Sequence, residues 1–361
     1  MTTISVETHQ DNMETQIEFT DHCEIKLEQR PFLSVITPAY NEAENLPRLY
    51  ERLVDTLNPM QLDWEWIIVD DHSGDQTFAV INELVDRDER IRGYRFARNF
   101  GAHKAITFGM HNAEGNCAAI MAADLQDPPE TLPLLLEKWE NGSQVVWAVR
   151  AQREGEKAST IGFSRVYYWL MRNIVGINEM PATGADFFLI DRRVMDALSE
   201  FDENNTSLLA LITWMGFRQS EISYDKQARL HGSSGWNLEK KVKLVVDSVT
   251  SFTYLPIRLM SYLGVFVAIL GFLYAAFVVA NAIAGRPTEG WSSLMVVVLV
   301  VGGIQMLMMG VLGEYLWRAL DEARHRPRFI VEADVGGEGE QKRPFVQQVN
   351  TTRIPVIEPE Q

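Results

Sequence analysis

The chain has 361 residues with 49 acidic and 33 basic side chains, so its formal net charge is -16. This length exceeds one average domain and allows a substantial buried core. The negative charge argues against a nucleic-acid partner, because a phosphate backbone needs a basic protein surface. The two cysteines, Cys23 and Cys117, lie in a predicted tail and a predicted core strand, so we expect no disulfide and a reducing compartment.

Residues 1–31 form an acidic extension with few large apolar side chains and no periodicity, which is typical of a disordered segment. The segment has neither the basic region nor the apolar region of a signal peptide, so we expect no cleaved signal. The chain after Ile330 is also acidic, and we expect it to be a solvated tail.

Short apolar runs alternate with amphipathic stretches from residue 33 onward. Residues 33–38 predict a strand, and residues 46–53 predict a helix with apolar side chains at helical spacing. Residues 66–69 predict a second strand, which ends at Asp70 and Asp71. Further strands and helices are predicted at 78–85, 91–96, 104–111, 117–121, 132–139 and 144–149. Buried strands that alternate with helices predict an α/β fold with a doubly wound, mostly parallel sheet.

Carboxylates follow the first, second and fourth predicted strands, as Glu42, Asp70 with Asp71, and Asp124. Ligands of open α/β sheets bind at the carboxyl ends of strands. Asp124 and Gln126 supply hard oxygen donors there, which suit a Mg²⁺ or Mn²⁺ ion that holds a substrate diphosphate. An acidic turn with helix-capping carboxylates is the alternative. The chain lacks the G-x-G-x-x-G and G-x-x-x-x-G-K-[ST] motifs, which weakens dinucleotide binding and P-loop hydrolysis.

Four motifs carry a family resemblance. They are Pro38-Ala39-Tyr40-Asn41-Glu42, Val69-Asp70-Asp71-His72-Ser73-Gly74-Asp75-Gln76-Thr77, Arg98-Asn99-Phe100-Gly101 and Ala123-Asp124-Leu125-Gln126-Asp127-Pro128-Pro129-Glu130. In this order they resemble the family 2 glycosyltransferases with the GT-A fold. More narrowly, they resemble the polyprenyl-phosphate hexosyltransferases, a group that includes dolichol-phosphate mannose synthases and bacterial undecaprenyl-phosphate glucosyltransferases. The resemblance covers roughly residues 32–326.

The resemblance implies roles for individual residues. The nucleotide pocket would be lined by Pro38, Tyr40, Glu42, Asp71 and Arg98. Asp124 and Gln126 would bind the metal and the diphosphate, and Asp186 would lie beside the acceptor. Arg229 and Ser234 would hold the acceptor phosphate. The catalytic residues implied in this way are Asp124, Asp186 and Arg229.

Two positions depart from the family pattern. The family's Asp-x-Asp often begins with an acidic residue where this chain has Ala122, so Asp124 carries more of the metal binding. The family commonly reads Arg-x-x-Gly-x-Ser-Lys where this chain has Gly235 in the lysine's place. One cation near the phosphate is therefore missing, and Arg229 with Ser234 does more of the binding. We interpret Asp191, by contrast, as a helix cap.

Two long apolar segments follow, Leu259 to Ala284 and Ser292 to Gly313, and neither contains a charged side chain. Each is about long enough to cross a bilayer as a helix, so the pair predicts a membrane hairpin, with buried core helices as the alternative. Basic residues flank both outer ends of the pair: Lys240, Lys241, Lys243, Arg258, Arg318, Arg324, Arg326 and Arg328. They predict a multi-pass inner-membrane protein whose large domain faces the cytoplasm.

A basic amphipathic helix is predicted just before the first span. Its apolar residues recur at helical spacing, opposite the lysines named above: Leu238, Val242, Val245, Val246, Val249 and Phe252. A surface helix packed on the domain is the alternative. The predicted divisions are an extension (1–31), a catalytic domain (32–236), a juxtamembrane helix (237–256), two membrane helices (257–317) and a cytoplasmic tail (318–361).

The predicted function is an inverting transfer of a hexose, with UDP-glucose as the first candidate donor, to undecaprenyl phosphate on the cytoplasmic face. GDP-mannose, UDP-N-acetylhexosamine and an aminopentose donor stay open. A processive polysaccharide synthase is disfavoured, because its Gln-x-x-Arg-Trp motif is absent and two spans are too few for a polymer channel. A catalytically inactive membrane scaffold is the alternative from another class. Small residues in the second span, Gly302, Gly303 and Gly310, predict a homo-oligomer.

Overall fold

The computed structural model describes residues 32–150, 171, 186–201, 203, 206–227, 250, 252–253, 255–284 and 290–336. Arg229, Ser234 and Gly235 lie outside these residues. Most of the predicted juxtamembrane helix lies outside them as well, as do the terminal segments 1–31 and 337–361.

An eight-stranded sheet forms the centre of the described domain, in the order β7-β5-β6-β4-β1-β2-β3-β8. The strands are β1 (Leu33–Ala39), β2 (Trp64–Asp70), β3 (Ile91–Phe96), β4 (Cys117–Ile120), β5 (Val145–Arg150), β6 (Phe187–Asp191), β7 (Gln219–Tyr224) and β8 (Val331–Val335). The pairs β4-β1, β1-β2, β2-β3 and β5-β7 are parallel, whereas β6 and β8 run antiparallel to their neighbours. The prediction of a mostly parallel α/β sheet is confirmed.

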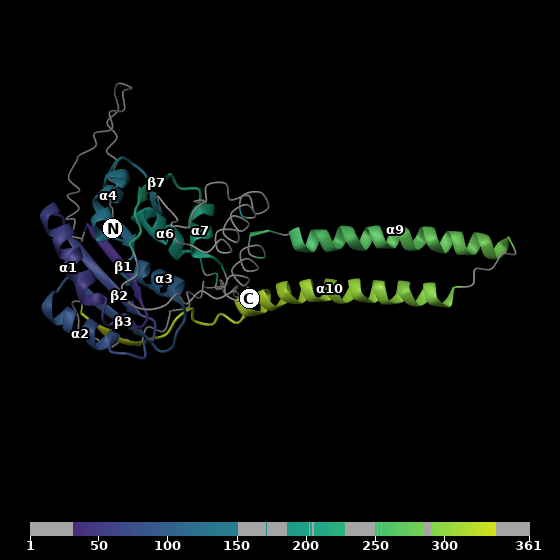
Figure 1. The fold of residues 1–361 in the computed structure, drawn as a ribbon, viewed down its shortest axis with the longest axis horizontal. Coiled ribbons are helices and arrows are strands. Elements are labelled where there is room, and N and C mark those ends of the chain that lie inside the picture. The colour runs from purple at the N-terminus through teal and green to yellow at the C-terminus, as the bar shows by residue number, and fades with distance from the viewer. Residues whose placement is uncertain are drawn as a thin grey trace, which may run out of the picture.

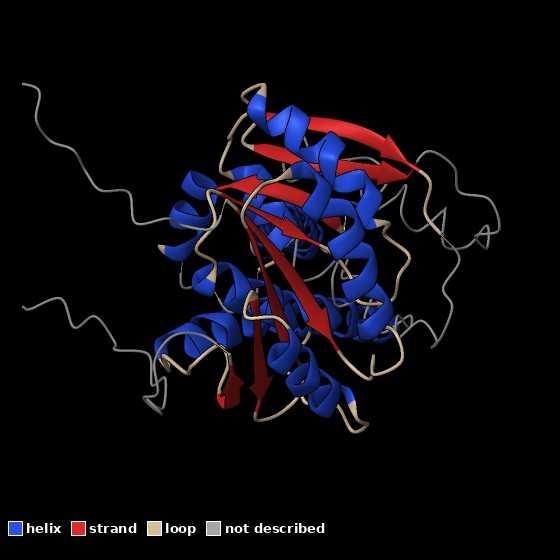
Figure 2. Ribbon diagram, turned by 90° about the vertical axis from the view of Figure 1, so that its left-hand side faces the viewer, coloured by secondary structure: helices blue, strands red, loops and turns tan. Residues whose placement is uncertain are grey.

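Helices cover both faces of this sheet (Figure 2). The side chains of β2 alternate between two cores, with Trp66 and Ile68 in one and Ile67 and Val69 in the other. The first core is covered by α1 (Leu46–Leu57), α2 (Thr77–Arg87) and α4 (Leu132–Glu140), and the second by α3 (Ala102–Asn112), α6 (Arg192–Ser199) and α7 (Leu208–Trp214). Strands buried on both faces explain the continuous apolar runs in the sequence. Short 3-10 turns occupy Asn58–Met60 and Pro129–Thr131.

Two long helices, α9 (Leu255–Ile283) and α10 (Trp291–Ala323), extend away from the domain side by side (Figure 1). At about 1.5 Å per residue they are roughly 43 and 50 Å long, which exceeds the ~30 Å hydrocarbon core of a bilayer. Their apolar spans have mean hydropathies of 2.6 and 2.4, and none of either span is buried. Both helices are therefore long and apolar enough to cross a membrane, and their exposure argues against buried core helices.

The chain returns to the sheet after α10. The Ala97 N–H donates to the Ile330 carbonyl at 2.9 Å, and β8 then pairs antiparallel with β3. The Phe329 ring stacks on the Phe96 ring at a centroid distance of 5.7 Å. The predicted solvated tail after Ile330 is therefore wrong for Val331–Val335, which forms the edge strand of the sheet.

A period-two pattern in the sequence explains this difference. Val331, Ala333 and Val335 alternate with Glu332 and Asp334, which is the pattern of a half-exposed strand. The two carboxylates gave the segment an acidic, tail-like composition that concealed this pattern. Burial follows the alternation, because the three apolar residues are half-buried and the two carboxylates are exposed.

Candidate active site

The loops after β1 and β2 are hydrogen-bonded to each other at the carboxyl edge of the sheet. The Asn41 N–H donates to Ser73 Oγ at 2.9 Å, and Asn41 Oδ1 accepts from the Gly74 N–H at 2.9 Å. The Glu42 N–H donates to Thr77 Oγ1 at 2.8 Å. These three bonds join the first two sequence motifs into one structural unit.

Left-handed backbone conformations mark the same edge. Asn41, His72 and Leu125 have φ angles of 58°, 61° and 59°, and they follow β1, β2 and β4 respectively. Such angles are uncommon for residues other than glycine and are concentrated at functional sites. The carboxyl edge of the central strands is therefore the candidate location of the active site.

Asp71 attaches the third motif to this unit. Its carboxylate is 3% exposed and accepts the Phe100 N–H at 2.6 Å and the Gly101 N–H at 2.8 Å. Burial raises the pKa of Asp71, and the two backbone hydrogen bonds oppose that rise. Asp71 thus holds the loop that carries Arg98 and Phe100 against the end of β2. Its predicted contact with the nucleotide stays a prediction.

Asp70 and Arg95 hold the loop after β2 through contacts with Ser73. Asp70 is fully buried and accepts the Ser73 N–H at 2.9 Å and also the Ser73 hydroxyl. Arg95 lies 3.4 Å from Asp70 Oδ2 and donates to the Ser73 carbonyl at 3.2 Å. From β8, Glu332 accepts from Arg95 at 3.1 Å and lies 3.5 Å from the His72 ring. The strand that follows the long helices therefore touches the second motif.

The other predicted nucleotide residues surround this unit. Tyr40 is 51% exposed, directly after β1, so its ring is available to a ligand. Pro38 is half-buried near the end of the same strand. The Glu42 carboxylate accepts from Asn45 Nδ2 at 2.6 Å. The Arg98 guanidinium lies over the Phe100 ring, 4.5 Å from its centre.

Asp124 and Gln126 lie in the loop after β4, on the same edge. Asp124 is 5% exposed, and its Oδ1 accepts the Gln126 N–H at 3.1 Å. Among the described residues, no group of three His, Cys, Asp or Glu side chains is arranged to hold a metal. Mg²⁺ is commonly bound by one or two protein oxygen ligands together with substrate phosphates. The carboxylate and amide oxygens of this loop fit that kind of site.

Asp186 reaches the same edge from the opposite direction. It directly precedes β6, which runs antiparallel to β4 and β5, so the start of β6 lies where those two strands end. The Asp186 carboxylate is largely exposed and lies 3.8 Å from the Arg150 guanidinium at the end of β5. The structure therefore places Asp186 near Arg150, which the sequence interpretation did not include.

At the other end of β6, Asp191 accepts the Arg193 N–H at 2.9 Å, so its predicted role as a helix cap is confirmed.

Three further residues of this edge were not assigned from the sequence. Asp127 is 1% exposed, and its Oδ1 accepts the Tyr224 hydroxyl at 2.6 Å and lies 3.6 Å from Lys226 Nζ. Burial raises the pKa of Asp127, and Lys226 opposes that rise. Asp127 belongs to the fourth motif, but Tyr224 and Lys226 lie in no motif that would have indicated a place in the site. Their approach depends on the parallel pairing of β5 and β7.

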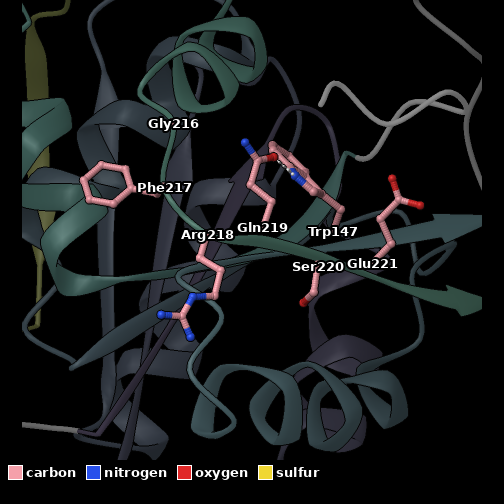
Figure 3. Close-up of a pocket in the computed structure, with 7 residues that line it drawn as sticks. All are labelled: Trp147, Gly216, Phe217, Arg218, Gln219, Ser220 and Glu221. Carbon is pink, nitrogen blue, oxygen red and sulfur yellow. Dashed lines mark hydrogen bonds between the residues drawn. The ribbon is translucent and has the colours of Figure 1, made fainter. Parts of the chain in front are cut away.

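A cavity of about 340 Å³ lies elsewhere on the domain, lined by Trp147 and residues 216–221 (Figure 3). The Trp147 indole N–H donates to Gln219 Oε1 at 2.7 Å beside it. Gln219 begins β7, so this cavity lies toward the amino end of that strand. The residues described above lie at carboxyl ends, where ligands of α/β sheets bind. Despite its volume, the cavity is therefore not the candidate active site.

The chain resembles known proteins across both its domain and its long helices. A solved structure, the mannosyltransferase PcManGT from Pyrobaculum calidifontis in complex with GDP-Man and Mn²⁺, is 16% identical with a TM-score of 0.41, covering 80% of this chain and 88% of that chain. Residues 34–198 match glycosyl transferase family 2, and residues 255–318 match the GtrB C-terminal hairpin.

Two curated relatives extend this likeness over most of the chain. The uncharacterized glycosyltransferase YkcC of Bacillus subtilis (strain 168) is 37% identical over 84% of this chain and 94% of that protein. The bactoprenol glucosyl transferase of Shigella phage SfV is 32% identical over 83% of this chain and 98% of that protein. The chain therefore belongs to glycosyl transferase family 2 and is a glycosyltransferase.

Proposed function

We propose that the protein transfers a hexose from a nucleotide diphosphate sugar, with UDP-glucose as the first candidate, to undecaprenyl phosphate at the cytoplasmic face of the membrane. One observation carries this proposal. The likeness to the bactoprenol glucosyl transferase of Shigella phage SfV spans 83% of the chain and 98% of that protein. A soluble acceptor would not require the apolar hairpin, whereas a polyprenyl lipid resides in the bilayer.

The reaction needs positioning more than proton transfer. A lipid phosphate is already an anion near neutral pH, so its oxygen can attack the anomeric carbon directly. A bond forms between that oxygen and the anomeric carbon, while the bond from the carbon to the nucleotide diphosphate breaks. A single displacement of this kind inverts the anomeric centre, in agreement with the inversion that the family resemblance implies.

Residues at the carboxyl edge are assigned to the two substrates. Tyr40, Glu42 and Arg98 border the nucleotide, on the loops that Asp71 and Ser73 hold together. Asp186 lies on the acceptor side. Arg229 and Ser234, which lie outside the described residues, bind the lipid phosphate, and a guanidinium suits the geometry of that anion.

Asp124 and Gln126 are the residues that would hold Mg²⁺ or Mn²⁺ with the diphosphate. Such an ion, when bound, stabilises the negative charge that develops on the leaving diphosphate. The oxygen donors of this loop suit either ion. Because Ala122 offers no carboxylate, this chain places most of the ligand charge on Asp124.

A transfer assay tests the proposal. Purified protein in detergent is incubated with undecaprenyl phosphate and, in turn, radiolabelled UDP-glucose, GDP-mannose, UDP-N-acetylglucosamine and a UDP-aminopentose, with Mg²⁺, Mn²⁺ or EDTA. We expect label in the lipid phase from UDP-glucose only, and none with EDTA. Label from another donor would correct the sugar. No label from any donor, together with retained nucleotide binding, would favour the inactive scaffold.

A further inference from the structure

We infer that Asp127 is a positioning residue, which fixes the segment leading into the Arg229 loop against the loop that carries Asp124 and Gln126. The inference rests on the proposed function, because it assigns the Arg229 loop to the acceptor phosphate. Asp127 itself touches neither substrate. It acts through Tyr224 and Lys226. Both belong to residues 224–227, the last part of the chain that the structure describes before Arg229.

Two residues of the fourth motif, Asp127 and Gln126, bind the same short segment, residues 224–227. Asp127 Oδ1 accepts the Tyr224 hydroxyl at 2.6 Å and faces Lys226 at 3.6 Å. The Gln126 carbonyl accepts the Gln227 N–H at 2.9 Å, and Gln126 Nε2 donates to the Gln227 carbonyl at 3.3 Å. A pair of backbone-directed bonds and a buried side-chain bond thus join two segments about a hundred residues apart.

Arg52 adds a third link from helix α1. Its guanidinium binds both oxygens of Glu130, at 3.0 and 2.6 Å, and donates to Gln227 Oε1 at 3.1 Å. This link is more exposed, so it contributes less than the bond to Asp127. The fourth motif therefore has two functions in this chain. Asp124 and Gln126 supply the oxygen donors, and Gln126 and Asp127 also hold residues 224–227.

Burial makes Asp127 the strongest of these links. Asp127 is 1% exposed, and Tyr224 is 8% exposed. A hydrogen bond between a carboxylate and a hydroxyl is stronger than a neutral one, and its loss leaves a buried group without a partner. Loss of the bond would free the end of β7 and the chain that follows it. Gln227 lies two residues before Arg229 in the sequence, so the position of Gln227 limits where the Arg229 side chain can reach.

The loops that we assign to the nucleotide sugar are held by other hydrogen bonds, which do not involve Asp127. Asn41 and Ser73 join the first two loops, and Asp71 joins the second loop to Phe100. Loss of Asp127 should therefore weaken acceptor binding more than nucleotide binding. A role in metal binding would instead change the metal requirement, so the two roles are separable by measurement.

The test uses full-length Asp127→Asn, Tyr224→Phe and the double variant in the transfer assay. We expect the KM for undecaprenyl phosphate to rise about tenfold in each single variant, because Tyr224→Phe removes the buried hydrogen bond and Asp127→Asn removes its charge assistance and the attraction to Lys226. The double variant should be no worse than the more affected single variant, since both changes weaken the same link. The donor KM and the metal concentration for half-maximal activity should stay within about twofold of wild type.

Asp88→Asn is the matched control, because Asp88 also accepts from a tyrosine hydroxyl and faces a cation, at the opposite end of α2 from the site. Its acceptor KM should equal that of wild type. An unchanged acceptor KM in Asp127→Asn, or an equal rise in the donor KM, would overturn the inference.

Hydrogen exchange separates failure of this inference from failure of the proposed function. In wild type the Gln227 amide is protected by its bond to the Gln126 carbonyl. We expect that amide to exchange at least tenfold faster in Asp127→Asn and Tyr224→Phe, and at the wild-type rate in Asp88→Asn. Unchanged exchange refutes the inference whatever the activity. The variants could exchange faster although wild type transfers no sugar. That outcome would refute the assignment of Arg229 to a lipid phosphate, and it would still support the link between Asp127 and Tyr224.

Discussion

Asp124 is the residue on which the proposed chemistry depends most. Asp124→Asn keeps the shape of the side chain and removes its charge, so an ion on the diphosphate would lose the carboxylate ligand that we assign to it. We expect kcat/KM to fall by at least about a hundredfold, the range found when a group that stabilises developing charge is removed. The melting temperature should fall by no more than a few degrees.

Asp55→Ala, an exposed carboxylate on α1, serves as the control and should retain wild-type turnover. Turnover of Asp124→Asn within about tenfold of wild type, at any metal concentration, would remove the metal assignment.

Asp88 gives a pH-dependent prediction for stability. It accepts from Arg90 at 2.9 and 2.6 Å and from the Tyr50 hydroxyl at 3.0 Å. The hydrogen bonds from Arg90 hold the pKa of Asp88 below its ordinary value. A lowered folded-state pKa stabilises the fold above the unfolded pKa of about 3.9, and this stabilisation is lost as the pH falls through the folded value.

Asp88→Asn should therefore lower the free energy of unfolding by about 1 to 2 kcal/mol at pH 7. Below pH 4 the difference from wild type should shrink, because the carboxylate of the unfolded wild type is then protonated and that of the folded protein follows as the pH falls through its lowered pKa. Tryptophan fluorescence during thermal unfolding in detergent, recorded at pH 7 and pH 3, measures both values. A difference that is equal at the two pH values would show that the charge of Asp88 contributes nothing.

At the scale of elements, the sequence predicted β1 to β5 well and did not predict β7 or β8. β1, β2, β4 and β5 are largely apolar runs, and β1 to β4 are each followed by a helix, so this part of the sheet has a local sequence signal. Val331–Val335 carries only a short alternating pattern with two carboxylates, and its pairing partner, β3, lies more than two hundred residues earlier in the sequence. The site shows the same division. Asp124 and Gln126 lie in a recognisable motif, whereas Tyr224, Lys226 and Glu332 reach the site only through sheet pairing.

The docking of β8 can be tested with a designed disulfide. Tyr94 and Asp334 are directly opposed in the antiparallel pair of β3 and β8. Opposed residues in such a pair have Cα atoms about 4.5 to 5.5 Å apart, within the range of a disulfide. We expect Tyr94→Cys with Asp334→Cys, in a Cys23→Ser background, to form an intramolecular bond under oxidation.

Mass spectrometry of the linked peptides and a monomer band on a non-reducing gel would report this bond. Tyr94→Cys alone should stay reduced, since Cys117 is buried in β4. A disulfide-linked dimer would contradict the pairing within one chain, because it would place the β8 of one copy on the sheet of another.

At the scale of the whole molecule, the two long helices are joined to each other near the domain and are attached to the domain through the segment after α10. The Tyr315 hydroxyl donates to the Thr253 carbonyl at 3.0 Å, which joins α10 to the chain just before α9. Beyond α10, Phe329 is buried against Phe96 and Phe108. Through Glu332 the same segment reaches Arg95 and the second motif. The segment after the hairpin therefore connects the long helices directly to the candidate nucleotide loops.

The orientation of this hairpin gives the last prediction. The start of α9 and the end of α10 lie together beside the domain, and the opposite ends of the two helices lie far from it (Figure 1). Arg258, Arg324 and Arg326 are on the domain side, so the domain should face the cytoplasm.

In a Cys23→Ser background, Gly290→Cys should react with a membrane-impermeant maleimide on intact spheroplasts, and Arg326→Cys only after permeabilisation. If both cysteines react only after permeabilisation, the helices do not cross the bilayer. If the pattern is reversed, the nucleotide loops lie on the side of the membrane that lacks nucleotide sugars, and the proposed donor is excluded with them.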